Sequence, residues 1–108
     1  MKKVLWHPKA RTEIKSFPDE VKRELGYLIF RLQKGESFGL PSSRPMPDVG
    51  AGVSELRVRG ADGIYRAFYY LKVGDQVLIL HAFKKKTQST PSQDIKLGAR
   101  RLKELIDE

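Results

Sequence analysis

The feature that most constrains the fold is a run of three strand-like segments separated by very short turns. The segments span Val53–Arg59, Ile64–Val73 and Gln76–Phe83, and they are rich in β-branched and aromatic residues. Their separators are 60–63 and 74–75, both containing Gly and Asp, a composition and length typical of β-hairpin turns. Turns this short join antiparallel neighbours, so the sequence predicts a three-stranded antiparallel meander.

The segments outside the meander predict one further strand and three helices. Lys2 to His7 is compatible with a short strand, and residues 8–15 with a short helix that begins at a proline. A second helix is expected from Pro18 to Gly35, and a third begins near Thr90. Residues 35–52, rich in Gly, Pro and Ser, are interpreted as a long surface loop.

The order of these elements predicts an α+β fold in a single domain over residues 1–108. We expect a small antiparallel sheet, made of the N-terminal strand plus the three-strand meander, packed by two N-terminal helices and a C-terminal helix. With 108 residues, 40% of them hydrophobic, the chain can bury one modest core.

Composition excludes several classes of protein. The chain has no cysteine and two histidines, so disulfides, thiolate zinc sites and His-rich metal cages are not expected. It lacks an apolar run long enough to span a membrane, and its N-terminus lacks the apolar run of a signal peptide. We expect a cytoplasmic protein with no metal and no cofactor. The net charge of +8 indicates a polyanionic partner, either nucleic acid or an acidic protein.

The two turns also predict the register of the meander. The first turn pairs Arg57 with Arg66, and the second pairs Phe68 with His81 and Tyr69 with Leu80. Alternation then gives one apolar face, which we expect to pack on the helices, consisting of Leu56, Val58, Tyr65, Ala67, Tyr69, Leu71, Leu78, Leu80 and Ala82. The other face mixes cations with aromatics: Glu55, Arg57, Arg59, Arg66, Phe68, Tyr70, Ile79, His81 and Phe83.

The expected pairing of Arg57 with Arg66 is the main functional signal. Like charges directly opposite each other destabilise a sheet, unless an anion lies between them. A phosphate group would satisfy both guanidinium groups through bidentate hydrogen bonds, and an aromatic ring such as Phe68 or Tyr70 could stack on a base. Rules of folding that are broken without gain tend to mark functional sites.

Each of these residues also has an ordinary structural explanation, and the sequence leaves both the functional and the structural explanation open. Arginines such as Arg57 and Arg59 are often merely solvated on a strand, and a histidine in an apolar strand, as His81 is, is often a satisfied core residue. Lys84, Lys85 and Lys86 could be a solvated strand end or could bind an RNA backbone with salt-dependent affinity.

Three segments of the chain form a recognisable set of motifs. They are Ser54-Glu55-Leu56-Arg57-Val58-Arg59, Ile64-Tyr65-Arg66-Ala67-Phe68-Tyr69-Tyr70, and residues 81–91, which begin His81-Ala82-Phe83-Lys84-Lys85-Lys86-Thr87-Gln88. Together they resemble the RelE/ParE superfamily of bacterial toxins, with greatest similarity to its HigB-like, phage-derived branch. The His7-Pro8 strand end and Phe17-Pro18 also fit, so the resemblance covers nearly the whole chain.

The resemblance implies the toxin component of a type II toxin–antitoxin system, a metal-independent endoribonuclease that cleaves mRNA, commonly on the ribosome. It also implies a cognate antitoxin, usually of helix-turn-helix type, and we expect an acidic antitoxin segment to cover the basic face of a monomeric toxin. Arg57, Arg59, Arg66 and Lys85 match basic positions of the family. The sequence departs from RelE-type members at Glu55, where they have a lysine, and at Pro91, near the position of their C-terminal tyrosine.

RNA carries its own nucleophile, the 2′-hydroxyl, so the enzyme needs a base, an acid and cations around the phosphate. His81 is the expected acid or base, because an unperturbed imidazole titrates near ~6.5. Arg66 and Arg57 would hold the phosphate and stabilise developing charge, and Arg59, Phe68 and the three lysines would bind RNA. Two alternatives remain open: a ParE-like inhibitor of DNA gyrase, and a nucleic-acid-binding module without catalysis.

Overall fold

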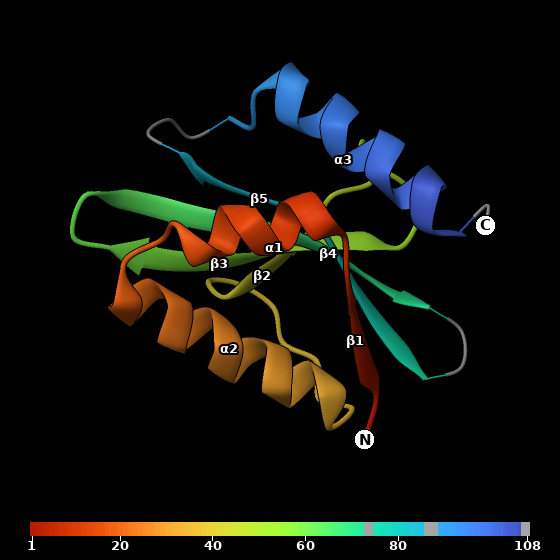
Figure 1. Ribbon diagram of the computed structural model, residues 1–108, viewed down its shortest axis with the longest axis horizontal. Helices are drawn as coiled ribbons and strands as arrows, with labels where there is room; N and C mark the ends of the chain where they lie inside the picture. Colours follow the sequence, from red (N-terminus) through yellow and green to blue (C-terminus); the bar gives the residue numbers. More distant parts are fainter. Residues whose placement is uncertain (73–74, 86–88, 107–108) are drawn as a thin grey trace.

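The computed structural model describes residues 1–72, 75–85 and 89–106. In this part of the chain, three helices and one five-stranded sheet form the fold, and Figure 1 shows the helices arranged around the twisted sheet. In chain order the elements are β1 (Lys3–Trp6), α1 (Pro8–Lys15), α2 (Asp19–Gln33), β2 (Ser43–Pro45), β3 (Val53–Gly60), β4 (Gly63–Lys72), β5 (Gln76–Lys85) and α3 (Ser92–Ile106). The α+β class and the three-strand meander are therefore confirmed, with strand ends within two residues of those predicted.

The sheet is mixed, and the prediction that it is wholly antiparallel was wrong for its first strand. The strand order is β1-β5-β4-β3-β2, and β1 runs parallel to β5, with Lys3 opposite Gln76 and Trp6 opposite Ile79. The two helices carry the chain from β1 to the far edge of the sheet, and the meander then returns to β1. The chain reverses direction three times between β2 and β5, because each of these strands is antiparallel to the next. The strand β2 runs opposite to β1, so β5 runs in the same direction as β1.

The segment interpreted as a loop contains the short edge strand β2. Ser43 to Pro45 pair antiparallel with β3, with Arg44 opposite Glu55. The sequence signal was hidden because Pro45 argues against a strand, although proline is tolerated at a sheet edge. The hydroxyls of Ser43 and Tyr69 lie 2.7 Å apart in the buried layer, so the strand is tied to the core as well as to its neighbour.

The predicted register of β3 and β4 is confirmed, with Arg57 opposite Arg66. Between β4 and β5 the pairing of Phe68 with His81 is also present, but Tyr69 pairs with Ile79 instead of Leu80. The connection is one residue longer than predicted, since Lys72 pairs with Gln76, and a bulge between Phe68 and Tyr69 restores the register. A bulge adds one residue to a strand and changes which face its side chains occupy.

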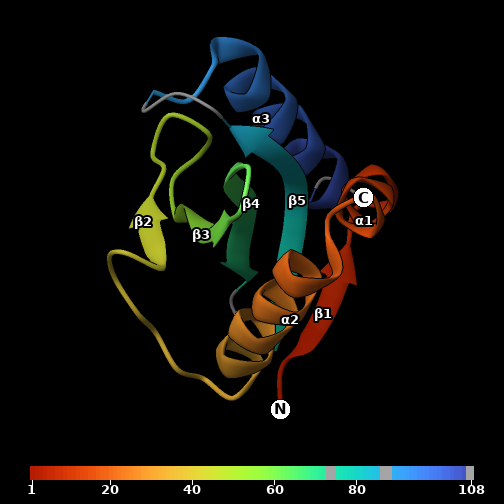
Figure 2. The same cartoon turned by 90° about the vertical axis from the view of Figure 1, so that its left-hand side faces the viewer.

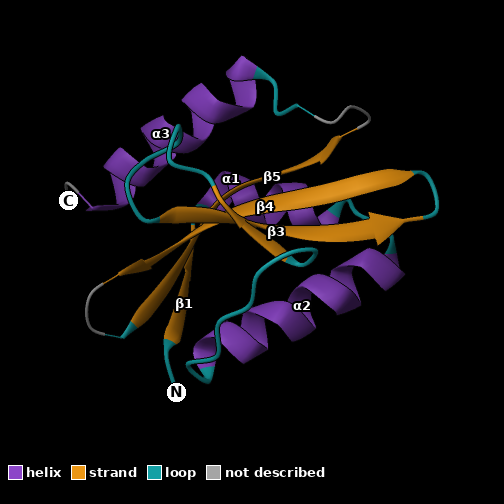
Figure 3. Cartoon of the chain, turned by 180° about the vertical axis from the view of Figure 1, so that it is seen from behind, coloured by secondary structure: helices purple, strands orange, loops and turns teal. Residues whose placement is uncertain are grey.

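Both faces of the sheet are covered by helices. One face packs against α1 and α2, with Ile79 and Val77 from β5 in its core. The other packs against α3, where Leu78 and Leu80 meet Phe68 and Leu102. The prediction that one face packs on all the helices was therefore wrong for α3, and Leu78 and Leu80 lie on the opposite face from the one predicted. Figures 2 and 3 show α3 and α2 on opposite sides of the strands.

Glycine allows α3 to approach the sheet closely. A Cβ atom on Gly98 would lie 2.6 Å from Cδ2 of Phe68 and 3.0 Å from the side chain of Val49, distances too short for non-bonded carbon atoms. Within the described ranges, no helix is both long enough and apolar enough to cross a membrane.

Candidate functional site

A cluster of arginines surrounds one buried carboxylate on the α3 side of the sheet. Glu55 of β3 is 0% exposed, as is Arg66 of β4, and Arg66 Nη1 donates a hydrogen bond to Glu55 Oε1. Arg44 Nε and Arg57 Nε lie 3.5 and 3.7 Å from the same oxygen. One carboxylate oxygen thus attracts three guanidinium groups from three adjacent strands, and we call these four residues the Glu55 cluster.

The Glu55 cluster explains how Arg57 and Arg66 can pair across the strands. The anion expected between them is supplied by the protein itself, from the position two residues before Arg57. Three cations remain around a single negative charge, and burial together with the charge of Arg66 lowers the pKa of Arg57. The arrangement is therefore electrostatically incomplete and favours a further anion.

The hydrogen bonding of the Glu55 cluster is also incomplete. Glu55 Oε2, Arg57 Nε and both Nε and Nη2 of Arg66 are buried and have no hydrogen-bond partner among the described residues. Buried polar atoms are normally satisfied, and exceptions tend to be functional. Beside the cluster lies a hollow of about 210 Å³ lined by Pro41, Ser42, Arg57, Arg59 and Ile64, which gives ligands access to Arg57 and Arg59.

Lys85 lies at the end of β5 close to the same cluster. It is 4% exposed, and its Nζ donates a hydrogen bond to Thr90 Oγ1 at 3.0 Å. Burial, reinforced by the positive charge of Arg66, lowers the pKa of Lys85 from 10.5 to about 8. An amine with this pKa can exchange a proton near neutral pH, so Lys85 can do more than bind an RNA backbone.

The other two lysines of the run have different outcomes. Lys84 is opposite Tyr65, a residue of the α1 and α2 core, and its Nζ binds Asp62 Oδ2 at 2.9 Å. Lys84 therefore lies on the opposite face of the sheet from Lys85, because neighbouring residues of a strand point to opposite faces. Lys86 lies outside the described residues.

His81 is held in a different cluster, which joins α1, β5 and α3. Its Nε2 lies 2.7 Å from Asp94 Oδ1, and its Nδ1 lies 3.3 Å from Glu13 Oε1 and 3.0 Å from Arg101 Nη1. The ring is 3% exposed and stacks on Phe83 at a centroid distance of 5.0 Å. Phe83 in turn lies opposite Arg66 across the strands.

Glu13 is the centre of this second cluster. Its carboxylate accepts hydrogen bonds from Arg101 Nη1 at 2.9 Å, Arg101 Nη2 at 3.2 Å and the backbone nitrogen of Ala82 at 3.1 Å. Burial alone would raise the pKa of Glu13, but the hydrogen bonds from His81, Arg101 and Ala82 outweigh it and lower the pKa to about 2. The ordinary explanation of His81, a satisfied buried histidine, therefore fits the structure better than the role of acid or base.

Phe68 is also in a position unsuited to its expected role. The side chain is 0% exposed and packs in the core beneath α3, with its ring 5.4 Å from that of Phe83. The expectation that Phe68 binds RNA by stacking on a base was wrong, because α3 covers its ring. Base stacking at this site would need another ring.

Sequence reasoning missed several members of both clusters. Arg44 was hidden in the segment interpreted as a loop, and Glu13 and Arg101 lie on helices α1 and α3, far along the chain from His81, which both contact. Glu55 was placed on the same face as the arginines and noted as a departure from the family, but it was not predicted to bind them. The strand alternation could have indicated this role, because it places a single acid on the same predicted face as three arginines.

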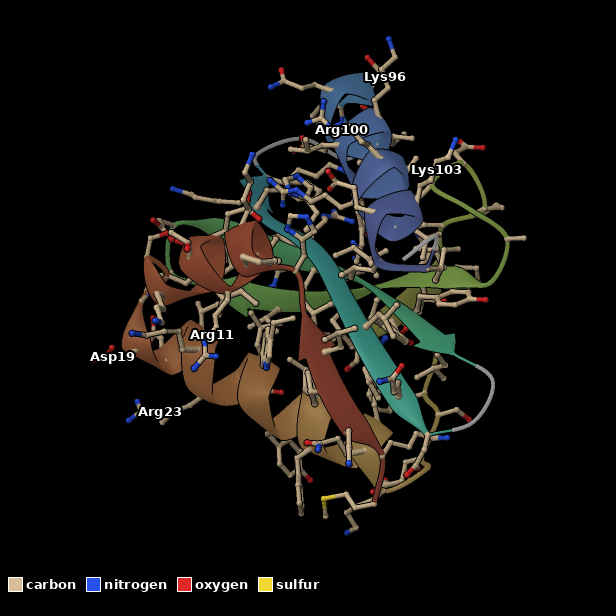
Figure 4. The ribbon with its side chains drawn as sticks, turned by 45° about the vertical axis from the view of Figure 1, so that its right-hand side comes forward. Arg11, Asp19, Arg23, Lys96, Arg100 and Lys103 are labelled. Atoms are coloured by element: carbon tan, nitrogen blue, oxygen red, sulfur yellow. The ribbon has the colours of Figure 1, made fainter. Side chains whose placement is uncertain are left out.

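The outer surface of α3 is basic. Figure 4 shows Lys96, Arg100 and Lys103 projecting from this helix, and all three are exposed. The acids of the same helix are engaged elsewhere, Asp94 with His81 and Glu104 with His7 at 2.9 Å. In the part of the chain that the structure describes, no group of three or more His, Asp or Glu residues is arranged to hold a metal ion.

Comparison with known proteins gives one family and a set of similar folds. Residues 12–103 match the family described as phage-derived protein Gp49-like, and no curated protein is significantly similar in sequence. The isolated Escherichia coli RelE toxin has a TM-score of 0.59 at 16% identity, covering 98% of this chain and 100% of that one. A mutant of the same toxin with two arginines changed to alanine, in the free state, has a TM-score of 0.61 at 17% identity, covering 88% and 95%.

A third similar structure contains an antitoxin. The toxin–antitoxin complex RelBE2 from Mycobacterium tuberculosis has a chain with a TM-score of 0.56 at 21% identity, covering 78% of this chain and 98% of that one. At these identities the comparison establishes a shared fold, which is the fold expected from the sequence resemblance.

Proposed function

The chain belongs to the phage-derived Gp49-like family, and from this membership, its RelE-like fold and its arginine cluster we propose that it is the toxin of a type II toxin–antitoxin system that cleaves RNA. The observation that carries the proposal is the Glu55 cluster beside an open hollow. Cations gathered around a site where an anion can enter are what an enzyme needs to hold a phosphodiester and stabilise charge in its transition state.

Binding of RNA uses the accessible cations of this region. Arg57 and Arg59 line the hollow of about 210 Å³ and contact the scissile phosphate, while the buried Arg66 contributes its charge from beneath. Arginine is suited to this task because its planar group binds phosphate bidentately.

Proton transfer is assigned to Lys85 in place of His81. The 2′-hydroxyl of RNA attacks the neighbouring phosphorus, losing its proton, and the 5′-oxygen leaves and gains one. Lys85, with a pKa of about 8, accepts or donates a proton in this step from a position next to the arginines. Both ring nitrogens of His81 are occupied, so its role in the proposal is to fix α3 to β5.

The partners of this toxin follow from the same surface. We propose that mRNA is the substrate, bound on the ribosome in the cytoplasm, and that an antitoxin of helix-turn-helix type neutralises a monomeric toxin. The net charge of +8 favours an acidic antitoxin segment over the basic face.

The test is brief induction of the protein in bacterial cells, followed by mapping of new 5′ ends in cellular mRNA by primer extension. We compare the wild type with R57A, K85M and H81A, using K96A on the outer face of α3 as a matched loss of one positive charge. New cuts that disappear in R57A and K85M, but remain in K96A, support the proposal. H81A is expected to fold less stably, and its residual activity measures how far histidine takes part.

Each other outcome identifies a different function. Growth arrest without new cuts, accompanied by DNA damage signalling, would indicate a gyrase inhibitor and not a ribonuclease. RNA that the purified protein shifts in a gel but never cuts would indicate a binding module without catalysis. Cuts that persist in both R57A and K85M would show that the Glu55 cluster is not the site of cleavage.

A further inference from the structure

Glu55 is the one acid within the Glu55 cluster, and its burial needs an explanation. A carboxylate with 0% exposure loses its hydration, and this cost is recovered only through good geometry with its partners. Here one oxygen attracts Arg44, Arg57 and Arg66, while Oε2 has no hydrogen-bond partner among the described residues. The carboxylate therefore brings three arginines together, although its own hydrogen bonding is incomplete.

The three arginines differ in what they can reach. Arg66 is fully buried, whereas the side chains of Arg44 and Arg57 are 38% and 19% exposed. Arg57 lines the hollow of about 210 Å³, and Arg44 lines a second hollow of about 420 Å³ that also includes Thr90, the partner of Lys85. The Nε atoms of both arginines lie near Glu55, and the two side chains line two different hollows.

We propose that Glu55 is a positioning residue, which holds Arg44 and Arg57 as a pair of receptors for phosphate groups of an RNA backbone. This inference rests on the proposed function for the identity of the ligand. It adds Arg44, from the edge strand β2, to the residues that bind RNA, and it gives the buried acid a task in binding. Without Glu55, mutual repulsion would separate the guanidinium groups, and phosphate binding would require them to be brought together again.

The alternative is that Glu55 only neutralises charge so that the sheet can fold. The variant E55D separates the two explanations, because it keeps the charge but shortens the side chain by one methylene group. A counter-ion tolerates this change, whereas a positioning residue does not, since small displacements of a binding group are costly. K96A serves as the control for a change of net charge away from the cluster.

The experiment is a titration of inorganic phosphate into the full-length ¹⁵N-labelled protein, followed through the Nε–Hε signals of arginine side chains, with sodium chloride at equal ionic strength as the blank. In the wild type and K96A, phosphate is expected to shift the Arg44 and Arg57 signals in a saturable manner. In E55D the apparent affinity is expected to fall about tenfold, with backbone spectra showing an intact fold. If E55D is unfolded, R44A takes its place, and it should lose the response of Arg57 in part while keeping the Arg66–Glu55 pair.

Unchanged phosphate affinity in E55D, or in R44A, would overturn the inference, and so would equal shifts with chloride. These results are independent of RNA cleavage. If phosphate binding depends on Glu55 but the protein never cuts RNA, the inference about Glu55 is supported and the proposed ribonuclease function is refuted. Unchanged phosphate affinity in E55D, in a protein whose RNA cleavage is lost in R57A, would remove the inference alone.

Discussion

Glu13 provides the sharpest test of how the helices are held on the sheet. Its carboxylate joins α1 to the backbone of β5 and to Arg101 of α3. The change E13Q keeps the size of the side chain but removes its charge, and so imitates the protonated acid. Arg101, which is 4% exposed, would then be a buried cation without its anionic partner.

The size of the effect follows from the pKa of Glu13. A fall from 4.5 to about 2 corresponds, at about 1.4 kcal/mol for each pH unit, to about 3 kcal/mol of stability above pH 5. The sign is that of a depressed acid: the stabilisation is present above the unfolded pKa and is lost as pH falls toward the folded pKa. With the pKa values of 4.5 in the unfolded state and about 2 in the folded state, about 1 kcal/mol of this stabilisation remains at pH 3.

The assay is urea unfolding at pH 7 and pH 3, followed by the fluorescence of the single tryptophan and by circular dichroism. At pH 7, E13Q should unfold at about 2 M less urea than the wild type, given ordinary urea dependence for a chain of this size. The difference should become smaller at pH 3. E24Q is the matched control, because Glu24 is exposed on α2 and should change stability little.

Two results would refute this reasoning about Glu13. An E13Q protein as stable as E24Q at pH 7 would mean that the bonds to Arg101 and Ala82 contribute no net free energy. A difference between wild type and E13Q that grows as pH falls would mean that the pKa of Glu13 is raised by burial, and that the hydrogen bonds do not outweigh it.

Three further predictions concern the packing and the cluster. G98A should lower the free energy of unfolding by about 1–3 kcal/mol, since its methyl group would overlap Phe68, and urea unfolding measures this; an unchanged midpoint would mean that α3 shifts without cost. Y69F should lose about 1 kcal/mol with the bond to Ser43, whereas S42A, in the adjoining loop, should not. Stability should rise between about pH 8 and 10.5 because unfolded Lys85 binds more protons than folded Lys85 there; K85M should show a smaller rise in the same unfolding assay.

The sequence by itself determined the local structure of this protein. Two short Gly- and Asp-containing turns and the alternation of the strands were enough to predict the meander and the pairing of Arg57 with Arg66, which is present. The strands of a hairpin are joined by a tight turn, so the few residues of that turn determine which residues pair across it. The clash of two opposed arginines also pointed to an anion, and the sequence already contained Glu55 two positions away.

Only the tertiary structure decided which surfaces are open. The bulge beside Phe68 turned Leu78 and Leu80 toward α3, which buries Phe68. His81 is enclosed between Asp94 of α3 and Glu13 of α1. None of this follows from periodicity, because a one-residue insertion changes the face of every later side chain and because the partners of His81 lie 13 and 68 residues away. A histidine or phenylalanine in a strand has the same sequence signal whether it is exposed for chemistry or buried for stability. The physical reason is that burial depends on the packing of distant elements, whereas sequence patterns report the neighbours along the chain.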